Sequence, residues 1–291
     1  MLCSMKEERS VSPEEIRGSK ERENMIPSGR AQTATSSLGP ARVLIALLAM
    51  SIATANAGLA DQIWIGLHGG LSIPNLRGGD NEYSQGYSSR EGPFFGVLAE
   101  FRLQPHFFLC GEVNYASQGG KRDGMQPVII DLPGMNLPPG LLLYADFDNE
   151  AILDYIEIPL LAEFTWGGRP RFFIDAGPYI GFLVRAKTVT GGVSSLYVDD
   201  SGTPLLVPPD YQPLPPVSFD ATTDTRNDIN DVSAGLAGRV GIAIPAGPGE
   251  LVLGVCFTLG LTNIQRDVET YGRNRTGAVV VAIGYNYLLK K

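Results

Sequence analysis

The chain has 291 residues, of which 23 are Lys or Arg and 31 are Asp or Glu, and 35 are glycine. This acidic balance argues against a nucleic-acid partner, because such a protein presents a basic face. No apolar run reaches the roughly 18 residues of a membrane-spanning helix. Charged residues make up 19% of the chain, below the roughly 25% of ordinary soluble domains. With many short alternating segments, this composition predicts an all-β protein.

The N-terminal region has the pattern of an export signal. Residues 1–40 show no apolar periodicity, so we expect a disordered extension there. Arg42 then precedes an apolar stretch over 43–55 that ends in Ala55-Asn56-Ala57, with small residues at the −3 and −1 positions of a cleavage site. We therefore expect 41–57 to be a signal peptide and 58–291 to be the mature domain. A short buried helix is the alternative, and Met25 is an alternative start that leaves a leader of ordinary length.

The mature region contains eight segments in which apolar side chains alternate with small or polar ones. This period of two is typical of strands whose two faces meet different surroundings. The eight segments cover about 62–73, 93–103, 107–118, 152–165, 171–186, 230–244, 250–263 and 276–289.

The connections between these segments alternate strictly in length. Short turns lie near 104–106, 166–170 and 245–249, whereas long connections cover about 74–92, 119–151, 187–229 and 264–275. Outer-membrane barrels have short periplasmic turns, long external loops and an even number of strands. We therefore predict an eight-stranded antiparallel up-and-down transmembrane β-barrel with its long loops at one end.

A soluble lipocalin-like barrel, which would make the chain an exported small-ligand binder, has the same strand number and is the main alternative. The apolar faces of the eight segments contain no charge, which suits lipid, and the opposite faces consist mainly of small residues with no lysine. A water-exposed exterior would carry many lysines and glutamates. The composition therefore favours the membrane barrel, with aromatic residues near the segment ends at the two interfaces.

Eight charged residues share the parity of the small-residue face, so we expect them to point into the lumen. They are Glu100, Arg102, Glu112, Glu157, Glu163, Asp175, Arg185 and Arg239. Buried charges must be paired, because leaving water costs several kcal/mol each. We interpret the group as an ion network that plugs a narrow barrel. A cation path or gate is the alternative, although eight strands leave little room for one.

Several segments, in order along the chain, resemble the PorT-like outer-membrane β-barrel family. They are Leu153-Asp154-Tyr155-Ile156-Glu157-Ile158-Pro159-Leu160-Leu161, Gly177-Pro178-Tyr179-Ile180-Gly181-Phe182-Leu183, Phe257-Thr258-Leu259-Gly260-Leu261-Thr262-Asn263-Ile264 and Ile283-Gly284-Tyr285-Asn286-Tyr287. The stretch from Gly66 to Ser72 fits the opening of the family pattern. The resemblance implies an outer-membrane barrel domain, mostly of unassigned role. Many such barrels end on an aromatic residue that the assembly machinery reads, whereas this chain ends in Leu-Leu-Lys-Lys.

Catalytic and cofactor motifs are sparse. Some eight-stranded outer-membrane barrels are lipid-modifying enzymes, which need a nucleophile beside a base, but there is no GxSxG motif. His68 faces the lumen, where a hydrogen-bonded structural role is expected, and His106 lies in a turn. We predict no catalytic residue, cofactor or metal ligand. Cys110 and Cys256 remain after export, and their spacing does not show whether they pair.

The long connection over 187–229 is rich in proline and aspartate, and its aspartates do not match an EF-hand loop. A solvated loop is the simplest interpretation, with surface recognition or divalent-cation binding as alternatives. The expected partners are the outer-membrane bilayer and the assembly machinery, with an unidentified partner for this loop and no nucleic acid. We predict a non-catalytic protein of the cell outer membrane with a structural, recognition or small-solute role.

Overall fold

The computed structural model describes residues 62–130, 141–208 and 210–290. The predicted disordered extension and the signal peptide with Ala55 and Ala57 therefore lie outside the described residues. Within the described part no helix is long and apolar enough to cross a bilayer.

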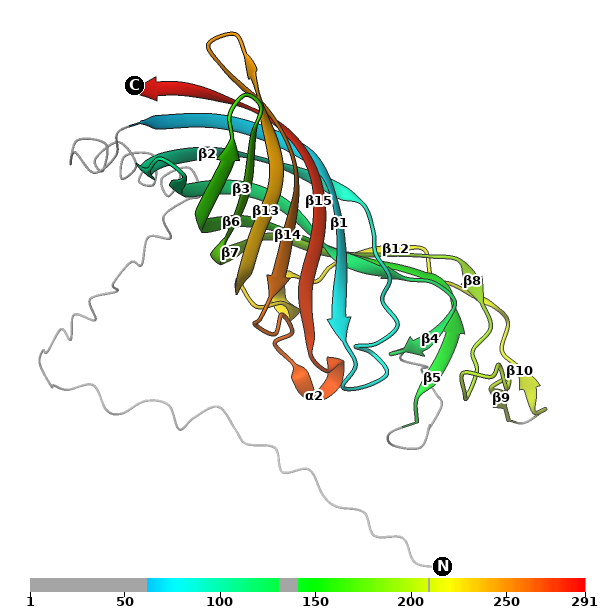
Figure 1. Cartoon of the computed structure of the whole chain (residues 1–291). Helices are drawn as coiled ribbons and strands as arrows, with labels where there is room; N and C mark the ends of the chain where they lie inside the picture. Colours follow the sequence, from blue (N-terminus) through cyan, green and yellow to red (C-terminus); the bar gives the residue numbers. More distant parts are fainter. Residues whose placement is uncertain (1–61, 131–140, 209, 291) are drawn as a thin grey trace, which may run out of the picture.

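Eight long strands close into an antiparallel barrel (Figure 1). Each strand pairs with its neighbour in the chain, β6 pairs with β7, and the last strand pairs with the first. The barrel strands are β1 (Ile63–Gly78), β2 (Gly92–Gln104), β3 (Phe107–Arg122), β6 (Asp148–Gly167), β7 (Arg171–Gly191), β13 (Val232–Ala246), β14 (Gly249–Gly260) and β15 (Asn274–Lys290). The predicted fold class is confirmed, and so is the alternation of short turns with long connections.

The side chains are distributed as a lipid-embedded barrel requires. Large apolar side chains cover the outer wall, and Leu67, Phe95 and Val281 are each more than half exposed. Charged and amide side chains fill the interior and are buried. A lipocalin has the reverse arrangement, with its apolar side chains inside, so the soluble alternative is wrong.

Aromatic side chains gather on the outer wall near the short turns. Phe164 lies between Phe107 and Trp166, with ring centroids 5.2 and 6.0 Å apart, and Trp166 stacks on Phe172 at 6.0 Å. Such rings are amphipathic enough to sit at the level of lipid headgroups. They mark the periplasmic edge of the apolar belt.

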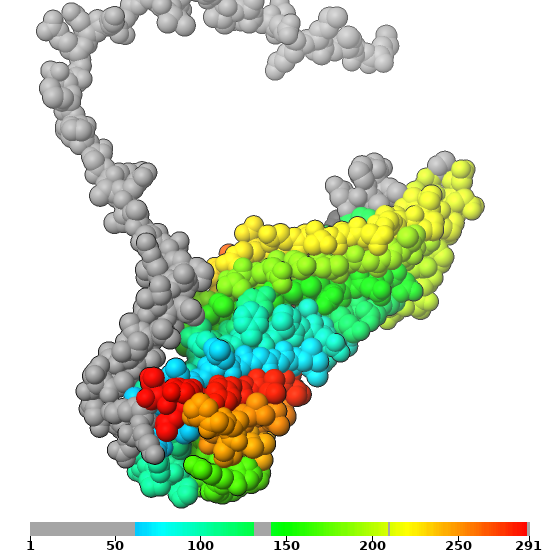
Figure 2. Space-filling view, turned by 90° about the horizontal axis from the view of Figure 1, so that it is seen from above, coloured from blue at the N-terminus to red at the C-terminus, as the bar shows by residue number. Residues whose placement is uncertain are grey.

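The long connections, which the sequence predicts to be loops, contain structure of their own. The minor elements are β4 (Met125–Val128), β5 (Leu143–Asp146), β8 (Val193–Ser194), β9 (Leu206–Val207), β10 (Gln212–Pro213), β11 (Val217–Ser218), β12 (Ala221–Asp224), the 3₁₀-helix η1 (Arg226–Asp228) and α2 (Val268–Tyr271). Strands β6 and β7 are also longer than predicted. They run past the barrel and carry an elongated extension, drawn in green and yellow in Figures 1 and 2.

Candidate functional site

The centre of the barrel holds an ion network built around Arg239. This residue lies on β13, and its side chain points into the lumen. Its guanidinium forms ion pairs with Glu112 at 2.6 Å, Asp175 at 2.6 Å and Glu163 at 3.4 Å. These three carboxylates come from β3, β7 and β6, so one side chain ties four strands together. The guanidinium also lies 5.5 Å from the ring centroid of Phe173, a cation–π distance.

A second guanidinium lies nearer the periplasmic end. Arg171 pairs with Glu163 at 2.8 Å, Glu250 at 3.0 Å and Glu100 at 3.4 Å. Glu163 therefore bridges the two arginines, and the network joins two guanidinium groups to five carboxylates. Neither Arg171 nor Glu250 was in the predicted set, although each has the parity of an inward residue on its strand.

Amide side chains satisfy the carboxylate oxygens that the arginines do not reach. Asn114 donates to Glu112 at 2.8 Å, and Asn286 donates to Glu100 at 3.0 Å. A buried carboxylate without such donors would lose its hydration and gain nothing in return. The lumen is thus filled by hydrogen-bonded side chains, and most of its carboxylates have an ion-pair or hydrogen-bond partner.

The predicted lumenal residues fall into three groups in the structure. Glu100, Glu112, Glu163, Asp175 and Arg239 lie together in the network. Glu157 is buried apart from them, where Gln118 donates to it at 2.9 Å. Two arginines do not lie where they were predicted.

The prediction that Arg185 faces the lumen is wrong. A register shift between Asp154 and Tyr155 places Asp154 opposite Arg185 and Tyr155 opposite Leu183. The extra residue, Val184, reverses the parity, so the Arg185 side chain is 54% exposed on the outer wall. There it pairs at 2.5 Å with the fully buried carboxylate of Asp154.

The prediction that Arg102 joins the carboxylates is also wrong. It lies at the periplasmic rim, where it donates to the carbonyl oxygen of Pro105 at 3.5 Å. Among the described residues no carboxylate forms an ion pair with it. Water reaches the guanidinium at this rim, so pairing is not required.

The Arg185–Asp154 pair should contribute to stability at the outer edge of the apolar belt. Arg185→Ala leaves a buried carboxylate without its guanidinium, so we expect the free energy of unfolding in detergent to fall by about 1–3 kcal/mol. Arg102→Ala, which breaks no ion pair, is the control and should change it by less than about 0.5 kcal/mol. Equal values for the two variants would contradict this assignment.

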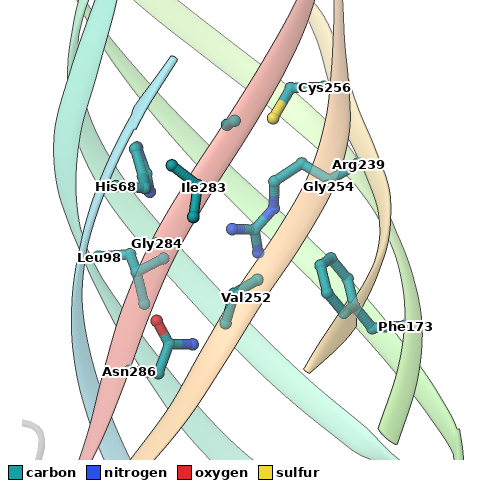
Figure 3. Close-up of a pocket in the computed structure, with 11 residues that line it drawn as sticks. His68, Leu98, Phe173, Arg239, Val252, Gly254, Cys256, Ile283, Gly284 and Asn286 are labelled. Atoms are coloured by element: carbon teal, nitrogen blue, oxygen red, sulfur yellow. The ribbon is translucent and has the colours of Figure 1, made fainter. Parts of the chain in front are cut away.

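A small cavity of about 20 Å³ lies beside Arg239, between β1, β14 and β15 (Figure 3). His68, Cys256 and Asn286 are among its lining residues. A volume of this size holds about one water molecule. The neighbourhood of Arg239 is therefore packed and is too narrow for a hydrated ion.

The histidines and cysteines are structural. His68 Nε2 lies 2.8 Å from Asn114 Oδ1, and its ring stacks on Phe94 with a centroid separation of 5.3 Å. His106 Nδ1 lies 3.0 Å from the carbonyl oxygen of Thr165. Cys110 and Cys256 are both free thiols. Within the described ranges no group of three or more His, Cys, Asp or Glu is arranged to hold a metal ion.

An apolar plug closes the lumen at the end that carries the long loops. Its buried members come from strands and from loops, and they are Leu76, Leu153, Tyr155, Leu183, Ala186, Ile229 and Ile264. Because Ile229 and Ile264 belong to two different connections, the loops fold over the barrel mouth. The ion network fills the centre of the barrel, and the plug fills its mouth at the end that carries the long loops.

The extension beyond the plug has a hydrophobic core of its own, and we call it the arm (residues 124–130, 141–147, 192–208 and 210–219). Its buried members are Leu143, Ala145, Phe147, Leu196 and Leu205. Tyr144 and Tyr197 exchange two backbone hydrogen bonds of 2.9 Å, and Phe147 stacks on Phe219 at 4.6 Å. The two longest connections thus fold together as one body.

Two aspartates of the arm accept backbone hydrogen bonds within its turns. Asp199 Oδ1 accepts from the backbone nitrogen of Thr203 at 2.9 Å and from that of Ser201 at 3.1 Å. Hydrogen bonding from the side chain and backbone of Thr203, and from Ser201, lowers the pKa of Asp199 to about 2. Asp220 accepts in the same way from the backbone nitrogen of Gly192 at 3.0 Å. Both carboxylates therefore act as turn caps.

Comparison with known proteins agrees with this architecture. A family model described as the outer membrane protein beta-barrel domain matches residues 55–266. The chain belongs to this family. It is therefore an outer-membrane β-barrel protein, as its apolar outer wall and charged lumen require. The search of curated proteins finds no match.

Solved structures similar to this barrel include Ail, the attachment invasion locus protein of Yersinia pestis, with 12% identity over 77% of this chain and 98% of Ail and a TM-score of 0.34. OprG from Pseudomonas aeruginosa shares 10% identity over 80% of this chain and 99% of its own, with a TM-score of 0.34. Neisserial surface protein A shares 12% identity over 77% and 96%, with a TM-score of 0.32.

Proposed function

We propose that this outer-membrane protein is a closed barrel whose role is to present the arm at the cell surface for recognition. The observation that carries the proposal is the second hydrophobic core in the arm, on strands β6 and β7 that extend past the barrel. A loop without function does not need such a core, since loops between barrel strands are usually short or solvated.

The surface of the arm supports a recognition role. Several apolar side chains remain exposed on it, including Ile129, Val193, Leu206 and Tyr211. Exposed apolar groups on an otherwise polar surface are typical of protein interaction sites. The filled lumen supports the same role, because it leaves no wide path for a solute.

The proposal includes three further statements. The protein is non-catalytic, since His68 is held by Asn114 and Phe94 and has no hydroxyl nucleophile among its hydrogen-bond partners in the described part. It reaches the outer membrane after cleavage at Ala57 and insertion by the assembly machinery. Within its family it groups with the PorT-like barrels, on the strength of the ordered segments quoted above.

The arm can be removed at two natural junctions. The backbone nitrogen of Phe147 donates to Gly124 at 3.3 Å, and that of Phe219 donates to Gly192 at 2.8 Å. A short Gly-Ser turn that joins Gly124 to Phe147, and another that joins Gly192 to Phe219, replace residues 125–146 and 193–218. The barrel and its plug stay in place. We call this variant the clipped barrel.

Recognition is tested by comparing the full chain with the clipped barrel on an array of glycans and extracellular-matrix proteins. We expect binding by the full chain, its loss in the clipped barrel, and the same unfolding free energy of the barrel in both. In planar bilayers neither protein should show a stepwise conductance. Equal binding by both proteins, or an open-pore conductance of the full chain, would contradict the proposal.

A further inference from the structure

A groove of about 480 Å³ lies on the outer wall of the barrel at the end that carries the long loops. It crosses four neighbouring strands, β13, β14, β15 and β1. Its apolar walls are formed by outward side chains, namely Ile73, Leu236, Phe257, Leu259 and Val279. Gly277 lies among them without a side chain, and the Arg77 guanidinium lies over it, with Nε 3.3 Å from the position that a Cβ would take. An extended hydrocarbon chain fits such a surface.

Arg77 lines the loop end of this groove, and Arg275 lies next to it on the neighbouring strand. Arg77 on β1 and Arg275 on β15 are directly opposite each other in the strand register, and both are exposed. Arg77 Nη2 donates to the carbonyl oxygens of Gly260 at 3.1 Å and Thr276 at 3.4 Å. These hydrogen bonds hold the guanidinium across β15, over Gly277.

The charges of this pair are not balanced by the protein. Among residues 62–130, 141–208 and 210–290, no carboxylate forms an ion pair with Arg77 or Arg275. Like charges directly opposite on adjacent strands destabilise a sheet. An anion between the two guanidinium groups removes this repulsion, and phosphate is the anion whose oxygens best match the donors of arginine.

The position of the groove identifies the kind of anion. Long loops of outer-membrane barrels face the outside of the cell, so the arginines lie at the headgroup level of the outer leaflet and the apolar walls lie below them. The occupant must therefore combine an acyl chain with a phosphate next to it. A free phosphate ion would leave the apolar walls unused.

We propose that this groove binds lipid A, a phosphorylated glycolipid, with one phosphate between Arg77 and Arg275 and one acyl chain along Ile73, Val279 and Phe257. Charge complementarity and the depth of the groove carry the assignment. It depends on the barrel alone, so loss of the recognition role of the arm would leave it unchanged.

Two different substitutions test the two halves of the site in the full chain. Arg77→Ala with Arg275→Ala removes the phosphate contacts. Gly277→Leu keeps the charge of both arginines but adds a bulky side chain to the groove where the Arg77 guanidinium crosses β15, since an added Cβ would already lie 3.3 Å from Arg77 Nε. Arg102→Ala, at the opposite rim of the barrel, is the matched control for removal of an exposed arginine.

Each detergent-purified variant is titrated with lipid A, and the bound lipid is counted by native mass spectrometry. We expect one tightly bound lipid A on the parent and on Arg102→Ala, and affinities lower by about tenfold or more for the double variant and for Gly277→Leu. Lipid A stripped of its phosphates should bind the parent at least about tenfold more weakly. The heat-dependent gel shift of folded barrels shows that each variant is folded.

The proposal fails if the double variant retains the parental affinity while folded, if dephosphorylated lipid A binds as well as lipid A, or if Arg102→Ala weakens binding as much as the double variant. Retained affinity in Gly277→Leu would likewise overturn the placement of the lipid over Gly277. Phosphatidylglycerol that binds as tightly as lipid A would overturn the choice of occupant.

Discussion

Arg239→Leu is expected to lower the free energy of unfolding of the barrel in detergent by about 3–5 kcal/mol, the largest effect of any single charge substitution in the lumen. Its guanidinium is the direct partner of Glu112, Glu163 and Asp175. All three carboxylates are buried, so removal of the cation leaves them in a medium of low polarity with mutual repulsion. Urea titration followed by tryptophan fluorescence measures the loss.

A rescue variant separates lost pairing from lost packing. Arg239→Leu combined with Glu112→Gln and Asp175→Asn neutralises the two carboxylates that have no other guanidinium partner among the described residues, whereas Glu163 keeps its ion pair with Arg171. Replacing a whole buried ion pair by neutral groups is often close to neutral, so we expect most of the lost stability to return. Arg102→Leu makes the same chemical change at the open rim and is expected to cost less than about 0.5 kcal/mol. A loss of stability in the triple variant as large as in Arg239→Leu would point to packing alone.

The alternation of side chains predicts the barrel because each strand separates lipid from lumen. Strand number, pairing order and the placement of short and long connections follow from the period of two and from turn residues. The same parity places Glu100, Glu112 and Asp175 inside. It also applies to Arg171 and Glu250, which are the first residues of the predicted segments 171–186 and 250–263 and lie at the start of β7 and β14. They were missed because strand ends are the least certain part of a periodic pattern.

Parity fails at Arg185 for a physical reason. The bulge opposite Asp154 inserts one residue into β7, and every side chain beyond it changes face. Nothing in the local sequence Val184-Arg185-Ala186 distinguishes this bulge from regular alternation. The arm was missed for a related reason, because its core joins residues from two connections that are far apart in the chain. Local patterns do not report such long-range packing.

Tyr155→Ala is expected to lower the free energy of unfolding by about 3–5 kcal/mol, as for other large buried aromatic side chains. Tyr155 is 1% exposed and lies in the plug with Leu153, Leu183 and Ile264. Since the plug joins two loops to the barrel mouth, the cavity left by alanine also weakens the contact between loops and strands. Urea unfolding in detergent gives the stability, and planar-bilayer recording of the same variant shows whether the mouth has opened.

Tyr155→Phe is the matched control, because it keeps the ring and removes only the hydroxyl group. That hydroxyl oxygen is buried and has no hydrogen-bond partner among the described residues. An unsatisfied buried polar group destabilises a folded protein, so its removal should leave stability unchanged or raise it by up to about 1 kcal/mol. The ring, which fills the barrel mouth, would then be the part of Tyr155 that stabilises the plug. A loss in Tyr155→Phe close to that in Tyr155→Ala would instead show that the hydroxyl group binds a partner within the plug.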